Sequence, residues 1–80
     1  DVLVRLGRVD EGIAAFQEAI RIQPDYANAH ANLAATYFDR GEYEEAERHA
    51  REALRIDPAH AAAAETLDAT QAAIAVRGRP

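Results

Sequence analysis

The fold is decided by residues 27–60, which read ANAHANLAATYFDRGEYEEAERHAREALRIDPAH. Gly41 and Pro58 divide this stretch, because helices end and turns form at glycine and proline. After Gly41 the apolar side chains follow the spacing of one helix face: Tyr43, Ala46, Ala50, Ala53 and Leu54. The stretch therefore predicts two helices joined by a short turn.

The outer face of the second helix carries charge. Glu44 stands four residues before Arg48, and Glu47 stands four residues before Arg51. An acid placed before a base at this spacing forms an ion pair on a helix surface. We interpret this run of charges as a solvated helix face.

The whole chain repeats itself with a period of 34 residues, so that Gly7 falls on Gly41 and Pro24 on Pro58. Further identical pairs share this register: Glu11 and Glu45, Glu18 and Glu52, Ala19 and Ala53, Arg21 and Arg55, Ile22 and Ile56. The register continues into a third unit, where Ala27, Ala29, Leu33, Ala35 and Thr36 fall on Ala61, Ala63, Leu67, Ala69 and Thr70. One shared register indicates stacked copies of one structural unit.

Helical spacing and turn residues together predict an all-α chain without strands. The expected helices lie near residues 1–6, 9–22, 26–39, 43–56 and 60–76. Gly7 is expected to end the first of them as Gly41 ends the third. With 20 alanines and five aromatic residues, the composition suits closely packed helices with a thin core.

The composition also limits the partners. Nine arginines and no lysine stand against fourteen acidic residues, which gives a net charge of −5. This surface repels the phosphates of nucleic acids and anionic membranes, and no stretch reaches the roughly 20 apolar residues that cross a bilayer. We therefore expect no nucleic acid and no membrane as partners, and a cytoplasmic location. The alanine and arginine content is typical of a genome of high GC content, so a bacterial source is expected.

Eight residues of the central stretch carry a family resemblance: Leu33, Ala34, Tyr37, Gly41, Tyr43, Ala46, Ala53 and Pro58. With them, residues 27–60 resemble one complete tetratricopeptide repeat, a unit of two antiparallel helices. His30 and Ala50 stand where the family usually has large aromatic residues, so packing there is expected to be looser. The resemblance implies an α-solenoid of antiparallel helical hairpins.

Partial units flank the complete one. Residues 1–26 resemble the end of the first helix and the second helix of a preceding repeat, and residues 61–76 resemble the first helix of a following one. Asp68 stands where the family keeps a small residue against a partner helix, so residues 61–76 are expected to form a capping helix, followed by a tail at 77–80. Upstream residues are expected to cover three apolar side chains, which would make the chain a fragment or a terminal module: Val2, Leu3 and Leu6.

The sequence offers no catalytic, cofactor or metal site. Without cysteine, thiolate catalysis and cysteine-ligated zinc are excluded. The three histidines lack metal-ligand spacing, so we interpret His30 as a packing residue and His49 and His60 as surface residues. The neighbouring carboxylates of Glu44 and Glu45 have nothing around them that would perturb a pKa for acid–base catalysis. No enzymatic activity is expected.

The resemblance implies that binding occurs on a concave surface lined by the first helix of each repeat. Transferred by position, the groove residues are Asn28, Ala31, Asn32, Ala35, Phe38, Asp39, Glu65 and Ala69. In related modules an asparagine at the position of Asn32 bonds a peptide backbone or carboxylate, although here its amide could equally do no more than solvate the groove. Phe38 is either a groove residue or a core residue between helices.

The bound segment is expected to be apolar or basic. Ala62 and Thr66 stand where family members that bind acidic chain ends have basic residues, and Glu65 lies between them. The leading interpretation is a protein-interaction module with a scaffold or adaptor role. Two alternatives stay open: a self-assembly element that associates through exposed solenoid ends, and an accessory domain that recruits protein substrates to a larger enzyme.

Overall fold

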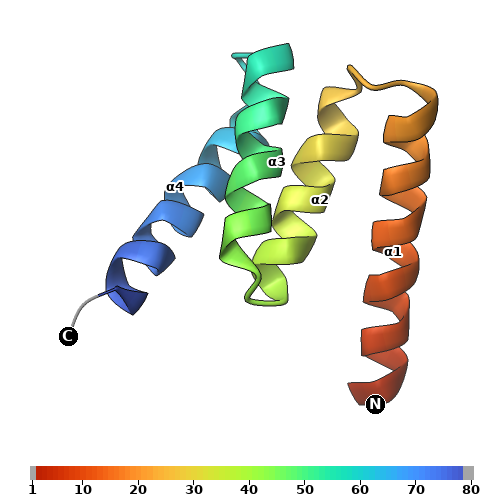
Figure 1. The fold of residues 1–80 in the computed structure, drawn as a ribbon, viewed down its shortest axis with the longest axis horizontal. Helices are drawn as coiled ribbons and strands as arrows, with labels where there is room; N and C mark the ends of the chain where they lie inside the picture. The colour runs from red at the N-terminus through yellow and green to blue at the C-terminus, as the bar shows by residue number, and fades with distance from the viewer. Residues whose placement is uncertain (1, 79–80) are drawn as a thin grey trace.

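The fold consists of four helices and no strand within the described residues. The computed structural model describes the backbone of residues 2–78 and the side chains of residues 10–78. The helices are α1 (Val2–Ile22), α2 (Ala27–Asp39), α3 (Tyr43–Ile56) and α4 (Ala61–Arg77), and they follow one another across the molecule (Figure 1). The prediction of an all-α chain is confirmed.

The turn residues act as the sequence predicts between α2 and α3. Gly41 has a φ of 80°, a left-handed conformation that glycine adopts without steric cost. Helix α3 then has Glu44 and Glu45 in its first turn and Arg55 in its last. These charges stabilise α3, because acids lie at the positive N-terminal end of its macrodipole and a base lies at the negative C-terminal end.

The predicted break at Gly7 is wrong, because α1 is a single helix of 21 residues that runs through this position. Glycine inside a helix costs only about 1 kcal/mol relative to alanine. At this small cost, α1 continues through Gly7 instead of ending there. The predicted packing of Val2, Leu3 and Leu6 lies outside the described side chains.

The core is built mainly from alanine. Among residues 10–78, nine hydrophobic side chains are buried: Ile13, Ala29, Ala31, Leu33, Ala34, Ala46, Ala50, Ala53 and Ala63. Ala31 of α2, Ala53 of α3 and Ala63 of α4 form one cluster, with Leu54 packed against it. Because these side chains are small, the helix backbones approach closely and dispersion contacts are dense despite the little apolar area available.

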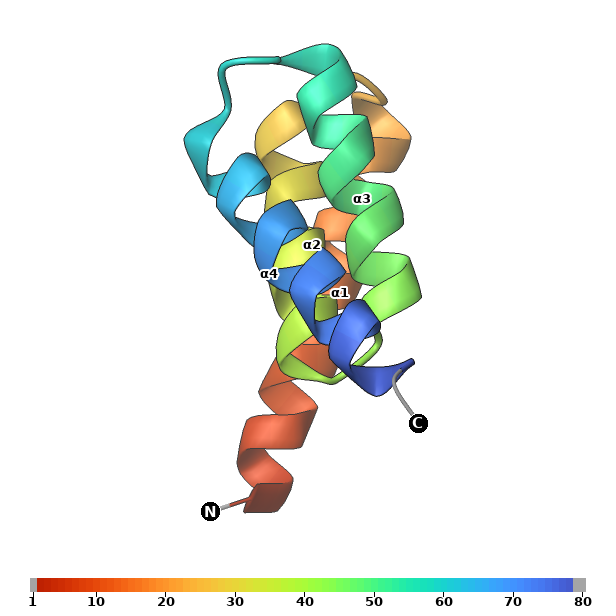
Figure 2. The same ribbon diagram turned by 90° about the vertical axis from the view of Figure 1, so that its left-hand side faces the viewer.

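Each helix packs against the next in sequence, and α4 also packs against α2. This second contact places α2 and α4 together on one side of the layer, as the turned view shows (Figure 2). The molecule is flat, with extents of 42 × 36 × 17 Å. Packing between near neighbours in a single layer is the arrangement of a solenoid, as the sequence predicts.

The two glycines of the repeat register should respond to substitution in opposite directions. We expect Gly7→Ala to stabilise the chain by about 1 kcal/mol, since alanine is the better helix former. Gly41→Ala should destabilise it by roughly 1–2 kcal/mol, because a side chain disfavours positive φ. Urea unfolding followed by circular dichroism measures both. A loss of stability in Gly7→Ala would contradict the continuous α1.

One buried polar atom lacks a partner among the described residues, and it predicts a stabilising substitution. The Oγ1 atom of Thr70 is buried without a hydrogen bond, whereas Thr36, its counterpart in the repeat, donates from Oγ1 to the Asn32 carbonyl at 2.8 Å. We expect Thr70→Val to raise the free energy of unfolding by about 1 kcal/mol, because it removes a polar group that burial penalises. Thr36→Val is the matched control and should give no such gain; equal effects would refute the explanation.

Candidate functional site

The predicted groove residues form an exposed stripe along α2 that begins beside α4. Asn28, Asn32, Ala35 and Asp39 are all exposed and follow the spacing i, i+4, i+7, i+11, which places them on one helix face. Glu65 and Ala69 of α4 are also exposed and are one turn apart. We call these six residues the α2–α4 face: Asn28, Asn32, Ala35, Asp39, Glu65 and Ala69.

Two of the predicted groove residues lie elsewhere. Ala31 is only 4% exposed, and it packs against Ala53 and Ala63 in the core. The expectation that Ala31 lines an accessible groove is therefore wrong, because α4 covers it. Phe38 is half-buried, and its ring lies 5.4 Å from that of Tyr43 in a tilted contact across the α2–α3 turn. Phe38 thus packs between helices and leaves only part of its surface to a ligand.

His60 joins α4 to the α2–α4 face. Its Nε2 donates to Oδ1 of Asn28 at 2.6 Å, and its Nδ1 accepts from the Ala63 backbone N–H at 3.2 Å. These two bonds assign the neutral tautomer with its proton on Nε2, and they make His60 the N-cap of α4. The interpretation of His60 as a surface residue was incomplete. Its place directly before the alanine run was the available signal for a cap.

The Asn28–His60 bond also sets what the face can offer a ligand. It occupies the carbonyl oxygen of the Asn28 amide and leaves the amide N–H₂ as a donor. Asn32 presents a second exposed amide one turn further along α2. The formal charges on the face are those of Asp39 and Glu65, both exposed, so its electrostatic potential favours cations.

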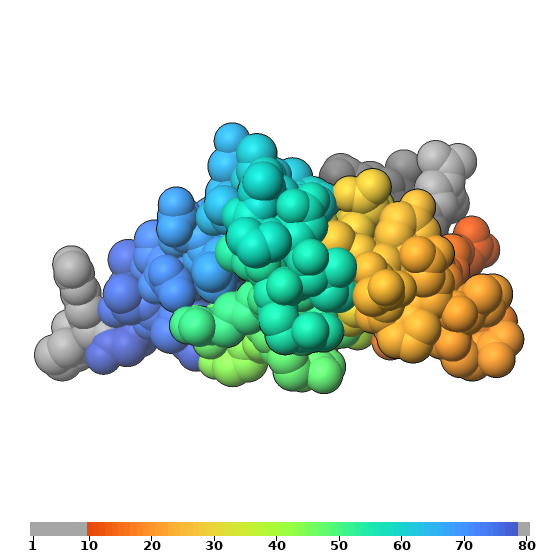
Figure 3. Space-filling model, turned by 90° about the horizontal axis from the view of Figure 1, so that it is seen from above, coloured from red at the N-terminus to blue at the C-terminus, as the bar shows by residue number. Residues whose placement is uncertain are grey.

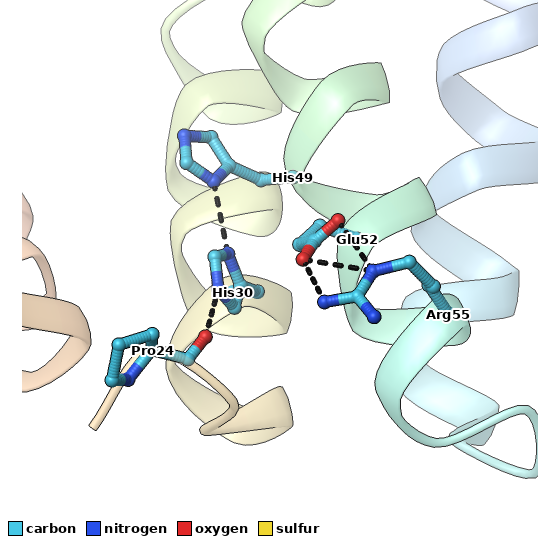
Figure 4. A network of polar contacts seen from close by, with 5 residues as sticks. All are labelled: Pro24, His30, His49, Glu52 and Arg55. Carbon is cyan, nitrogen blue, oxygen red and sulfur yellow. Dashed lines mark hydrogen bonds and ion pairs between the residues drawn. The ribbon is translucent and has the colours of Figure 1, made fainter.

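A second feature lies on the other side of the layer, where α1 and α3 flank α2. A hollow of about 330 Å³ is lined by Ile20, Pro24, His30, Arg48, His49 and Glu52. It belongs to the end of the molecule shown in Figure 3, where the segments around residues 20–30 and 50–60 meet. The Nδ1 atoms of His30 and His49 face one another there at 3.3 Å (Figure 4).

The burial of one histidine of this hollow agrees with the expectation from the sequence, and the burial of the other does not. His30 is buried, as expected for a packing residue. His49, expected on the surface, is half-buried with its ring stacked on Tyr37 at 5.6 Å. Burial lowers the pKa of His49, and the nearby charges of Arg48 and His30 lower it further.

Ion pairs engage the acidic residues of α3. Arg48 pairs with Glu45 at 2.5 Å and Arg51 with Glu47 at 3.1 Å. The predicted Glu44–Arg48 pair is replaced by a pair between Glu44 and Arg77 of α4, because α4 brings a cation to this face that helical spacing alone cannot reveal. The hydrogen bond from Arg77 lowers the pKa of Glu44. A carboxylate so engaged stays ionised and is a poor general acid.

The described part of the chain was also expected to lack a metal site and a membrane-spanning segment. No group of three or more His, Cys, Asp or Glu side chains there could hold a metal ion. No helix in it is long and apolar enough to cross a membrane.

The capping role of His60 can be measured. We expect His60→Ala to lower the free energy of unfolding by about 1 kcal/mol, as loss of a helix N-cap usually does. His60→Asn should recover most of this loss, since an asparagine oxygen can accept the same N–H. Urea unfolding at neutral pH gives both values. Equal stability of His60→Ala and the parent chain would show that the bond to Ala63 does not stabilise α4.

The chain is similar to known proteins that contain tetratricopeptide repeats. A family model described as "Tetratricopeptide repeat" matches residues 1–59. The TPR repeat-containing thioredoxin TTL4 of Arabidopsis thaliana is 45% identical over 47 residues, which is 59% of this chain. The inactive TPR repeat-containing thioredoxin TTL3 of the same plant is 45% identical over 47 residues. The match spans only 7% of the length of each relative.

Proposed function

Because this chain belongs to the tetratricopeptide repeat family, whose domains generally mediate protein–protein interaction, we propose that its α2–α4 face binds an extended segment of another protein. The observation that carries the proposal is the exposed stripe on α2, with Asn28 and Asn32 one turn apart. Exposed amides can donate to peptide carbonyls and accept from peptide N–H groups. The packed helices beneath them form a rigid support, which lowers the entropic cost of binding.

The charge of the face favours a basic segment with apolar side chains. Asp39 and Glu65 lie on the face and Asp68 is exposed on α4. The net charge of −5 adds a longer-range attraction for cations. Ala35, Ala69 and the exposed part of Phe38 provide apolar contact between the charges. An acidic chain end would find no cation at Ala62 or Thr66.

In this proposal the α2–α3 hairpin, residues 27–60, is the complete repeat. Residues 1–26 form a partial repeat, and residues 61–76 form the capping helix, whose outer face carries Asp68. The role of the module is that of a scaffold or adaptor.

The second candidate function is an accessory domain that recruits protein substrates to an enzyme. The observation in its favour is that the relatives named above are described as TPR repeat-containing thioredoxins, of which the matching segment is a small part. The same α2–α4 face would bind the recruited protein. The two functions differ in whether an enzyme is attached to the module. An assay of a longer chain for enzymatic activity on a protein bound to the module distinguishes them.

Charge reversal on the face tests the binding proposal. The probes are two labelled peptides, one of alternating leucine and arginine and one of alternating leucine and glutamate, followed by fluorescence anisotropy. We expect the arginine peptide to bind more tightly, and Asp39→Lys with Glu65→Lys to weaken it by about tenfold at low salt, because opposing charges become like charges.

A matched variant controls for net charge. Glu11→Lys with Glu18→Lys makes the same change at exposed positions of α1, a helix whose described residues do not pack against α4, and should alter the affinity by less than about twofold. Equal losses in both variants, equal binding of the two peptides, or no binding of either would contradict a cation-selective face. Concentration-dependent mass in sedimentation would instead favour self-assembly.

A further inference from the structure

The His30–His49 contact lies apart from the α2–α4 face and has a defined direction. Nε2 of His30 is 3.2 Å from the Pro24 carbonyl oxygen, which can only accept, so this nitrogen carries a proton. In the neutral ring Nδ1 of His30 is then an acceptor. The facing Nδ1 of His49, at 3.3 Å, must be the donor. These contacts assign His30 the Nε2–H tautomer and His49 the Nδ1–H tautomer.

The same assignment leaves Nε2 of His49 as an acceptor. This atom faces Nη2 of Arg48 at 3.5 Å, which carries only donors. Donors and acceptors therefore alternate from Arg48 through His49 and His30 to the carbonyl of Pro24. The order can be followed from His49 to Pro24 in Figure 4.

The chain of contacts joins three parts of the fold. Pro24 lies in the α1–α2 turn, His30 in α2 and His49 in α3. Within the described residues α1 packs against α2 but not against α3, so the histidine pair links the turn after α1 to α3. The pair is held from the side by Tyr37, whose ring stacks on His49.

Protonation acts on this pair in two steps. A first proton can be held on Nε2 of His49 with the Nδ1–Nδ1 bond intact, at the cost of placing a cation against Arg48. A second proton leaves each Nδ1 with a hydrogen and no lone pair, so two donors and two like charges face one another at 3.3 Å.

The surrounding groups offset this repulsion only in part, because the carboxylates of Glu45 and Glu52 raise the pKa of His49 less than burial and the charge of Arg48 lower it. From α3, Arg48 is a cation, and the carboxylates of Glu45 and Glu52 are engaged by Arg48 and Arg55. From α2, Tyr37 is neutral. From the α1 side the hollow is lined by Ile20 and Pro24, which carry no charge.

We propose that the His30–His49 pair is an acid-released latch that holds the α1–α2 turn to α3 at neutral pH and opens in mild acid. On release the half-exposed His49 turns toward solvent, and the hollow gains the space of its ring. The turn then loses its connection to α3, and α1 is free to change its angle to the other helices.

The pH range follows from His49, whose pKa is lowered from 6.5, first by burial. Below about pH 6.5 the released or unfolded chain binds more protons than the closed one, so the latch is fully closed above this pH and is lost as the pH falls. For each proton taken up on release, the equilibrium constant between the released and the closed state rises by at most about tenfold per unit fall in pH. The pKa values of Glu18, Glu44 and Glu52 are lowered by their arginine partners, so these groups stay ionised in this range.

Nitrogen-15 NMR of the histidine rings in the intact chain is the direct test. At about pH 7.5 we expect His30 to carry its proton on Nε2 and His49 on Nδ1. On acidification to about pH 5.5, the resonances of the His49 ring and of the backbone amides near Pro24 should change over the same pH range. A His49 ring with its proton on Nε2 at neutral pH would overturn the latch. So would independent titration of the two rings as free histidines.

Two variants separate the latch from other acid effects. His49→Phe keeps an aromatic ring against Tyr37 but cannot be protonated, and the fall in urea midpoint between about pH 7.5 and 5.5 should largely disappear. His60→Asn removes the histidine that lies outside the pair while keeping a cap on α4, and the fall should persist. A fall abolished in His60→Asn and retained in His49→Phe would assign the acid sensitivity to α4 and reject the latch.

Discussion

The close packing of alanine on alanine, where α2, α3 and α4 meet, is the constraint on which the rest of the structure depends. Ala31, Ala53 and Ala63 each come from a different helix and form one buried cluster. Small side chains bury little apolar area each, so stabilisation depends on short distances between backbones. A larger residue at any of these positions would separate the helices. The flat single layer agrees with this, because Ile13 and Leu33 are the large apolar side chains buried among residues 10–78 and the other buried apolar side chains there are alanines.

A thin core makes polar contacts between helices more important than in a larger protein. Two histidine arrangements join elements that alanine packing alone leaves loosely connected. His60 caps α4 and bonds Asn28 of α2, while His30 and His49 join the α1–α2 turn to α3. In both, a ring nitrogen accepts a hydrogen bond, which only a neutral imidazole can do.

The two sides of the layer have different chemical character. The α2–α4 face presents exposed amides, alanines and the carboxylates of Asp39 and Glu65. The outer surfaces of α1 and α3 carry ion pairs within and between helices, such as Glu18 with Arg21 and Glu44 with Arg77. Paired charges of this kind maintain solubility and add little to stability. The two sides therefore differ in how far their charged groups are already paired within the chain.

The sequence by itself determined the helical class, the 34-residue register, the turn at Gly41 and the exposed stripe on α2. Each of these depends on local periodicity or on backbone preference, which are read along a single segment. Only the tertiary structure decided that α1 continues through Gly7, that Ala31 is covered by α4 and that Glu44 pairs with Arg77. It also decided that His30 meets His49, 19 residues away on another helix. These outcomes depend on which helix packs against which face, and the spacing of residues within one helix carries no information about its neighbours.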